Sequence, residues 1–300
     1  MGNGVRQGLN YSEFSKLLVL EPPLIEQERV SAFLDEKCAQ IDDLINVFNN
    51  QIKGLSEYKK SIIYETVTKG LSKKAKTKSS NLNWIEQIPD DWGVDRIKYR
   101  FNNSKGLPIT KDDLIDSGLP VISYGQIHSK LNSGVDISDD LLRFVDDRFR
   151  SLYPNCEIKK YDFVFADTSE DYDGCGNCVY KRDDRITYAG YHSIILHSKY
   201  QNDNRYFAYL FKTDCWRKQL RENASGVKVY SISQKSLLNA SIIVPPYEEQ
   251  IKISDYLDDK CTSIDNCIIS KNRMIDLLKE YKKTMIFEYV TGKKEVPSHL

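Results

Sequence analysis

Apolar residues recur every three or four positions along two long stretches of the chain, and this pattern predicts two long helices. The first runs from about residue 30 to 68, and the second follows Pro245-Pro246 with the same phases. Steps of four and three are typical of the seam of a coiled coil. The seam residues are Ile41, Ile45, Phe48, Ile52, Leu55 and Ile62 in the first stretch and Ile264, Ile268, Ile275, Leu278 and Met285 in the second. Lys59, Lys271 and Lys282 interrupt the seams, so neither stripe is fully apolar.

The two stretches are copies of one sequence. Pro22-Pro23-Leu24-Ile25-Glu26-Gln27 returns as Pro245-Pro246-Tyr247-Glu248-Glu249-Gln250, an offset of 245 − 22 = 223 residues. Matched residues include Leu34/Leu257, Asp35/Asp258, Lys37/Lys260, Cys38/Cys261 and Glu57-Tyr58-Lys59-Lys60/Glu280-Tyr281-Lys282-Lys283. A repeated element around an unrepeated segment indicates a scaffold that holds something apart. We expect the copies to pack on each other, parallel or antiparallel, within one chain or between two; packing on another neighbouring element is the alternative.

Each proline pair marks a sharp entry into its helix, because proline cannot continue a preceding helix. The residues before the prolines, Leu17–Leu20 and Ser241–Val244, read as short strands. The repeat therefore starts earlier than the prolines, near Leu9 and Ile232.

Between the two copies the pattern changes from helical to short and alternating. Residues 69–80 are cationic and lack periodicity, which fits a solvated linker or a segment that touches phosphates. From Trp84 to about Asn239, the runs 121–124, 162–165 and 193–196 predict buried strands, and 205–220 predicts a helix. We therefore expect an α+β fold in which one mixed α/β domain is flanked by two long helices that pair as a coiled coil.

Composition excludes several classes of protein. The 300 residues carry 43 basic and 43 acidic side chains, so a nucleic-acid partner has to be argued from local features. We find no run of 18 apolar residues and no apolar signal segment, and we expect a cytoplasmic protein. The seven scattered cysteines predict reduced thiols. Cys175 and Cys178 could form half a zinc site or a redox pair, but a second ligand pair does not follow closely, which favours structural thiols in a turn.

The sequence shows no catalytic constellation. The phosphate-binding, dinucleotide, nucleophile-elbow and zinc-protease motifs are all missing, and the four histidines accompany no obvious nucleophile. Val244-Pro245-Pro246-Tyr247 resembles the Pro-Pro-Tyr of adenine methyltransferases but lacks their Asn or Asp. The acidic run from Asp167 to Gly174 lacks the glutamate that a calcium-binding hand needs. We expect no enzyme, no metal and no cofactor.

The middle of the chain does carry side chains that suit DNA. Amides and guanidinium groups can form paired hydrogen bonds with adenine and guanine, and Ser, Tyr and Lys reach base edges or phosphates. The candidates are Tyr124, Gln126, Lys130, Ser169, Tyr172, Lys181, Arg182, Arg185, Tyr191, His192, Ser225, Lys228 and Tyr230. For any one of them the competing interpretation is an ordinary polar side chain facing solvent.

The repeated Pro-Pro-x-x-Glu-Gln, the Leu-Asp pairs and the Tyr-Lys-Lys runs together resemble the conserved regions of type I restriction-modification specificity (S) subunits. The segment between them fits as well. Trp84 with Ile88-Pro89-Asp90-Asp91-Trp92 resembles the opening of a target recognition domain. Residues 161–167 with 189–192 resemble its middle, and 224–226 with 231–233 its end. The resemblance covers essentially the whole chain.

The resemblance divides the chain into five parts. They are the tail of a preceding recognition domain (1–21), the first conserved spacer helix (22–70), a basic linker (71–83), the target recognition domain (84–244), and the second conserved helix with a C-terminal tail (245–300). A complete subunit of the family has two recognition domains, so this chain resembles a half-length form. A natural half, a product of recombination and a truncation are all compatible with the sequence.

The resemblance implies a non-catalytic subunit. Its recognition domain would read one half of an interrupted site in double-stranded DNA, and its helices would set the spacing and dock methyltransferase (M) subunits and a nuclease-translocase (R) subunit. We expect two copies, or this chain and another half subunit, to pair through the seam residues named above and read a two-fold site. The alternative is a coiled-coil adaptor that presents a globular protein-binding domain.

Overall fold

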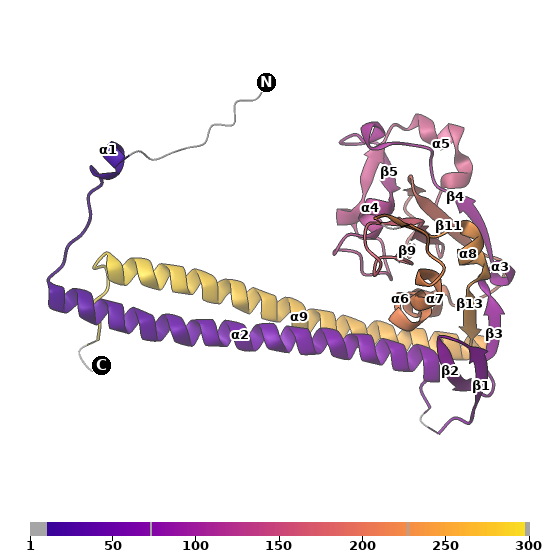
Figure 1. Ribbon diagram of the computed structural model, residues 1–300, viewed down its shortest axis with the longest axis horizontal. Helices are drawn as coiled ribbons and strands as arrows, with labels where there is room; N and C mark the ends of the chain where they lie inside the picture. The colour runs from indigo at the N-terminus through magenta and orange to yellow at the C-terminus, as the bar shows by residue number, and fades with distance from the viewer. Residues whose placement is uncertain (1–10, 73, 227, 298–300) are drawn as a thin grey trace. The chain divides into compact units, whose positions relative to one another are not determined.

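The computed structural model describes residues 11–72, 74–226 and 228–297 (Figure 1). Predictions for residues 1–10, within the expected recognition-domain tail, lie outside the described residues. The helices are α1 (Tyr11–Phe14), α2 (Leu24–Lys69), α3 (Ile97–Arg100), α4 (Tyr124–Ile127), α5 (Arg148–Leu152), α6 (Asn204–Lys212), α7 (Asp214–Arg221), α8 (Gln234–Asn239) and α9 (Tyr247–Val290), with 3-10 turns at Lys111–Asp113, Asp139–Leu141 and Pro154–Cys156.

The strands of the described residues are short and belong to five small sheets. They are β1 (Thr77–Leu82), β2 (Ile85–Pro89), β3 (Gly93–Arg96), β4 (Phe101–Lys105), β5 (Leu119–Ile122), β6 (Arg143–Val145), β7 (Phe163–Ala166), β8 (Thr168–Ser169), β9 (Cys178–Tyr180), β10 (Tyr188–Ala189), β11 (Ser193–Ser198), β12 (Tyr230–Ser231) and β13 (Ser241–Val244). The chain separates into two compact units. One contains residues up to Leu55 and from Asp265 onward, and the other contains Ser56–Ile264.

In the first unit, α2 and α9 lie side by side and run antiparallel (Figure 1). The ring of Phe33 lies 4.7 Å from that of Tyr289, and Lys282 Nζ lies 2.7 Å from the Asp42 carboxylate. Ile41 is buried in one apolar cluster with Phe33, Leu34 and Met285. Residues far apart in sequence therefore meet along the expected seam, within one chain.

Two of the lysines that interrupt the seam, Lys271 and Lys282, have partners on the opposite helix. Lys271 Nζ bonds to Gln51 Oε1 at 2.6 Å and lies 5.5 Å from the centre of the Phe48 ring. Lys282 pairs with Asp42, and this hydrogen bond raises the pKa of the lysine. Both lysines thus rest their carbon stems on the seam and keep their charged ends near polar groups.

The second unit is organised around a four-stranded sheet with the order β4-β11-β7-β9. Its strands alternate between two apolar clusters, because successive side chains of a strand point to opposite faces. Phe163, Phe165, Ile194 and Leu196 pack toward α6 and α7 on one face. The residues between them, including Val164 and Ile195, enter a second cluster on the other face. With both faces covered, these strands read as continuous apolar runs.

A second sheet, with the order β10-β5-β6, packs over its own cluster around Val121, Val145 and Tyr188. The pairing of β10 with β5 is parallel, and Ala189 lies opposite Ile122. In the four-stranded sheet, Ala166 at the end of β7 lies opposite Ser193 at the start of β11. These registers fix where the loops after each strand emerge.

The ends of the long helices form part of the core of the second unit. Ile63 and Val67 near the end of α2 are buried in the same cluster as Ile253 and Leu257 near the start of α9. The hydroxyl of Tyr206 on α6 donates to the carbonyl of Val67 at 3.0 Å. The globular part of this unit is therefore packed on both helix ends.

Three expectations about local structure need correction. Leu17–Leu20 form no strand and are exposed, whereas the matched Ser241–Val244 form β13 because β3 pairs with them. The expected basic linker contains β1, which pairs with β2 in a hairpin, so its polar side chains alternate along a real strand. The helix expected at 205–220 is broken at Thr213, whose backbone is extended. Among the described residues, no helix has the length and apolar character needed to cross a membrane.

Candidate nucleic-acid interface

Several of the predicted DNA-binding residues meet at one edge of the second unit. The ring of Tyr124, at the start of α4, lies 5.5 Å from the rings of both Tyr191 and His192. Tyr172 and Tyr230 form a second ring pair at 5.5 Å. We call Tyr124, Tyr191 and His192 with Thr168, Tyr172 and Tyr230 the aromatic cluster.

The strand registers explain why the aromatic cluster forms. Tyr124 follows β5, Tyr191 follows β10, Thr168 follows β7 and His192 precedes β11. Since β5 runs parallel to β10 and the end of β7 lies opposite the start of β11, these three loops emerge near one another. Tyr230 joins them because β12 pairs with β8 at Tyr230 and Ser169.

His192 is held in place by its polar neighbours. Its backbone has a φ of 52°, a left-handed conformation that is rare for residues other than glycine. Its Nδ1 lies 3.2 Å from the Asp167 carboxylate and 3.2 Å from the Thr168 hydroxyl. The histidine side chain is nevertheless 55% exposed, so the rest of the ring is available to a ligand.

His128 holds these loops in place through two hydrogen bonds. Its Nε2 lies 2.7 Å from the carbonyl of Thr168, and its Nδ1 lies 3.1 Å from the amide nitrogen of Asn177. A carbonyl can only accept, so Nε2 carries the proton, and Nδ1 then accepts from Asn177. His128 therefore fixes the loop that presents Thr168.

Two predicted residues serve the loops rather than a ligand. The Gln126 amide oxygen accepts from the backbone nitrogen of Ser123 at 3.1 Å in a capping box, so paired bonding to adenine would require breaking this cap. Ser169 is only 2% exposed, and its hydroxyl donates to the carbonyl of Asp171 at 2.7 Å.

The three predicted cations at 181–185 do not join the aromatic cluster. Lys181 is 1% exposed and pairs with Asp183; burial, with nearby Arg185, lowers its pKa to about 8. Arg182 makes two hydrogen bonds of 2.6 Å to Asp258 on α9. Arg185 pairs with Asp139 and donates to the carbonyl of Ile137 at 3.0 Å. Their charged groups therefore pair with carboxylate and carbonyl groups of the second unit.

The remaining candidates are exposed. Lys130 follows α4, and Lys228 precedes β12, close in sequence to Tyr230. Ser225 is tied to Ser231 by two backbone hydrogen bonds of 3.0 and 2.8 Å, which shape the turn that carries Lys228. Each of the two lysines is therefore close in sequence to a tyrosine of the aromatic cluster, Lys130 to Tyr124 and Lys228 to Tyr230.

Sequence reasoning missed Asp167, Thr168 and Asn177 as contributors to this edge. Asp167 and Thr168 do lie in the acidic run whose spacing does not fit a calcium-binding hand. Their role comes from the pairing of β7 with β11, which places them beside His192. The feature of the sequence that could have pointed to Asp167 and Thr168 is a polar run directly after a buried strand.

Cys175 and Cys178 are buried side chains of the core of the second unit. Cys175 and Cys178 are free thiols and buried, and burial raises the pKa of Cys178 to about 12. The carbonyl of Cys175 accepts from Arg217 at 3.1 Å. Among the described residues, no three His, Cys, Asp or Glu side chains converge as metal ligands.

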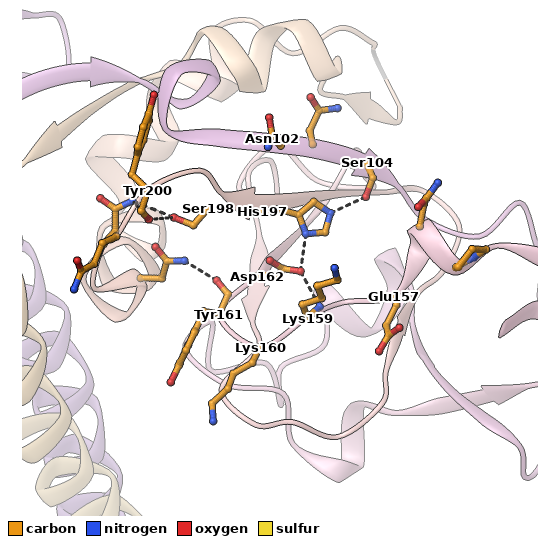
Figure 2. A pocket seen from close by; sticks show the side chains of 16 residues that line it. Asn102, Ser104, Glu157, Lys159, Lys160, Tyr161, Asp162, His197, Ser198 and Tyr200 are labelled. Carbon is orange, nitrogen blue, oxygen red and sulfur yellow. Dashed lines mark hydrogen bonds and ion pairs between the residues drawn. The ribbon is translucent and has the colours of Figure 1, made fainter. Parts of the chain in front are cut away.

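A polar pocket of about 810 Å³ lies elsewhere on the second unit (Figure 2). In it, His197 Nε2 lies 3.0 Å from Ser104 Oγ and its Nδ1 lies 2.7 Å from Asp162, two partners that are far from His197 in the sequence. Asp162 also accepts from the backbone nitrogen of Lys159 at 2.7 Å. These hydrogen bonds hold β4 and β11 to the turn before β7. We assign them this structural role.

Comparison with known proteins identifies related sequences. The profile of the family described as "Type I restriction modification DNA specificity domain" matches residues 89–280, more than half of the chain. The type I restriction enzyme MjaVIII specificity subunit of Methanocaldococcus jannaschii is 25% identical over 286 residues. That alignment covers 94% of this chain but only 63% of the relative.

Solved structures show the same fold. A structure from work on complex assembly and conformational transition of the type I R-M system has a TM-score of 0.65 at 15% identity, and the match covers 90% of this chain and 60% of that one. The HsdS subunit from Thermoanaerobacter tengcongensis has a TM-score of 0.53 at 14% identity, covering 98% and 65%. This chain therefore spans less than two thirds of the length of the relatives that it matches.

Proposed function

Because the chain belongs to the family of type I restriction-modification DNA specificity domains, we propose that it is the sequence-specific DNA-recognition subunit of a type I restriction-modification complex. Specificity subunits of type I systems recognise DNA and do not catalyse the reactions of their complexes. The aromatic cluster is the observation that supports a DNA-reading role most directly. Four loops bring five rings and a threonine hydroxyl to one edge of the domain.

The chemistry of the aromatic cluster suits base edges in a groove. Tyrosine and threonine hydroxyls can donate or accept, and an imidazole can do either. Asp167 and His128 hold His192 and Thr168 in position before DNA arrives, so less ordering is needed on binding. Lys130 and Lys228 would contact phosphates, which adds affinity that falls with salt.

We propose that the domain reads one half of an interrupted site. A single recognition domain offers few base contacts, so two chains bound to a two-fold site would supply the missing specificity. The seam residues Ile52 and Ile275 already belong to the helix pair of one chain. A contact between chains would therefore use the outer faces of the helices.

The outer face of α9 suits a protein partner. Met274, Leu277 and Tyr281 are spaced like one face of a helix, and they are exposed by 49%, 58% and 60%. Exposed apolar stripes of this kind mark protein contacts. We propose that this stripe docks a methyltransferase subunit. A nuclease-translocase subunit would then join the complex through that methyltransferase subunit.

The decisive experiment expresses this chain with its methyltransferase subunit and sequences the methylated adenines of the host. A defined bipartite sequence is expected. Tyr124→Ala with His192→Ala should abolish or relax the half-site read by this domain. Tyr200→Ala is the matched control, since Tyr200 is 62% exposed but lines the pocket of Figure 2 instead.

Random methylation, or a pattern that both variants leave unchanged, would contradict the proposed reading surface. The adaptor alternative makes a different prediction. An adaptor would purify with a protein partner and retain no preference among DNA sequences at any salt concentration.

A further inference from the structure

Another pocket of the second unit, of about 740 Å³, gathers four basic side chains. It lies where the last turns of α2, the loop after α4 and the start of α7 meet, and all of its lining residues belong to the second unit. The basic residues are Lys60, Lys212, Arg217 and Arg221, and none of them belongs to the aromatic cluster. We call the cavity lined by these four residues the basic pocket.

Arg217 carries a charge that its hydrogen-bond partners do not neutralise. Its Nε donates to the carbonyl of Cys175 at 3.1 Å, and its Nη2 donates to the carbonyl of Asp173. A carbonyl oxygen accepts a hydrogen bond but has no net charge. Within the described ranges, no carboxylate pairs with this guanidinium, and its Nη1 bonds to no acceptor. Burial and the nearby charge of Arg221 lower the pKa of Arg217, so its charged form lacks compensation.

Arg221, one turn further along α7, adds a second buried charge. It is 8% exposed, and its Nε has no acceptor among the residues that the structure describes. Its Nη2 pairs with Asp214 and lies 3.3 Å from the carbonyl of Asp173. A buried charged donor without an acceptor costs free energy. An anion in the basic pocket would compensate both guanidinium groups.

The acidic residues that line the basic pocket do not cancel its charge. They are Glu57, Asp173 and Asp214, so four basic groups face three acids. Glu57 pairs with Lys60 at 3.1 Å, and Asp214 is already engaged by Arg221. The start of α7 lines the same cavity, and its first turn has no side-chain cap. The N–H groups of such a turn also favour an anion.

The basic pocket adjoins the aromatic cluster. Asp173, whose carbonyl accepts from both arginines, directly follows Tyr172 of the cluster. Asn177 lines the basic pocket and bonds to His128, which holds the carbonyl of Thr168. Guanidinium groups and helix starts are both suited to phosphate oxygens. A duplex whose base edges meet the aromatic cluster would carry its backbone past the basic pocket.

We propose that the basic pocket binds a phosphate group, and that the backbone of the DNA at the aromatic cluster supplies it. Arg217 would bind a phosphate oxygen through Nη1, and Lys212 and Arg221 would add charge around it. Lys60 brings α2 to the same phosphate. Such a contact carries no information about the bases, but it fixes the register of the domain on the duplex. In taking DNA as the source of the phosphate, the inference rests on the proposed function.

The salt dependence of DNA binding tests the proposal in the full chain. The affinity for a labelled duplex of arbitrary sequence is measured by fluorescence anisotropy between about 50 and 200 mM KCl. Each neutralised phosphate contributes about 0.9 to the slope of log affinity against log salt. Arg217→Gln should therefore lower the slope by about 1. Arg217→Lys keeps the charge and should keep the slope, whereas a merely structural role would affect both variants alike.

Arg96→Gln is the matched control, because Arg96 is exposed on β3 and lies outside the basic pocket. It should leave the slope unchanged, and an equal loss in this control would overturn the proposal. Thermal melts show whether each variant folds. If Arg217→Gln does not fold, Lys60→Gln replaces it, because the Lys60 side chain is 75% exposed and its replacement should lower the slope in a folded chain.

Inorganic phosphate separates the two sources of the ligand. If free phosphate is the ligand, it should raise the melting temperature of the native chain at constant ionic strength but not that of Arg217→Gln, and both chains should have the same DNA slope. That result would keep the phosphate site and overturn its assignment to DNA. Equal slopes without any effect of phosphate would overturn the site itself.

Failure of this inference can be told apart from failure of the proposed function. A native chain with no affinity for any duplex would contradict the proposed function. An unchanged slope in Arg217→Gln would contradict only the assignment of the basic pocket to DNA. Because phosphate contacts do not depend on sequence, the slope can change as expected even where the methylation pattern is random.

Discussion

Asp258 and Asp35 occupy the same position in two copies of one helix, and we predict that replacement by Asn destabilises the chain at position 258 but not at position 35. Asp258 is 23% exposed and accepts from Arg182, from Tyr209 and, at 3.1 Å, from Arg205. Asp35 is exposed, and no described residue forms an ion pair or hydrogen bond with its carboxylate. The pair isolates the effect of the surroundings from that of the residue.

The magnitude follows from the contacts that are lost. Asparagine keeps one carbonyl oxygen, so it can still serve Tyr209 or one guanidinium, but it loses the charge that both arginines need. Hydrogen bonds to charged groups contribute about 1.5–3 kcal/mol each, and partial exposure favours the lower end. Losing two such bonds gives a cost of about 3 kcal/mol. Asp35→Asn should stay within about 0.5 kcal/mol.

Thermal unfolding followed by tryptophan fluorescence and circular dichroism measures both. About 2–4 °C per kcal/mol is expected for a unit of this size, so Asp258→Asn should lower the transition by roughly 6–12 °C. Urea titration should show the same order with an unchanged slope. Equal effects of the two replacements, or a stable Asp258→Asn chain, would refute the reasoning that this carboxylate anchors the globular part of its unit.

Three further predictions concern the second unit. Cys178 should resist maleimide at pH 8 in the folded chain while exposed Cys267 reacts, because a pKa of about 12 leaves about one thiolate in ten thousand; rapid labelling of Cys178 would argue against its burial. Lys181→Met should flatten the pH dependence of the free energy of unfolding above pH 8. The pKa of this lysine is about 8 in the folded chain and about 10.5 in the unfolded chain, so the native protein gains stability as the pH rises between these values. Denaturant melts at pH 7 to 10 test this. Gly106→Ala should destabilise by about 2–4 kcal/mol because its Cβ would collide with the carbonyl of Gly190, whereas Gly125→Ala meets open space and should be neutral, as thermal melts of both will show.

Much of the fold could be predicted because its signals are local. The seam spacing and the proline pairs located α2 and α9, and the apolar runs located β5, β7 and β11. The strand β1 escaped because its side chains are mostly polar and its pairing with β2 is what stabilises it. Leu17–Leu20 misled for the opposite reason, since an apolar run becomes a strand only when another strand pairs with it.

The site was harder to predict because side-chain partners are distant in sequence. Arg182 resembled a guanine-reading residue until Asp258, 76 positions away, was found to hold it. Tyr124 is far in sequence from Tyr191 and His192, and only the strand registers bring the three side chains together. The side-chain chemistry could be inferred from residue types, whereas its availability depends on tertiary contacts.

The meeting of four strand ends beneath the aromatic cluster has a consequence for how such a protein can change. The apolar residues buried on the two faces of the sheet below lie outside the aromatic cluster, although Tyr124 and Tyr230 pack against them. Substitutions at the other loop positions therefore leave the core of the unit intact. Under the function proposed above, a lineage carrying this domain could acquire a new DNA target by loop substitution alone, without any change in the helices.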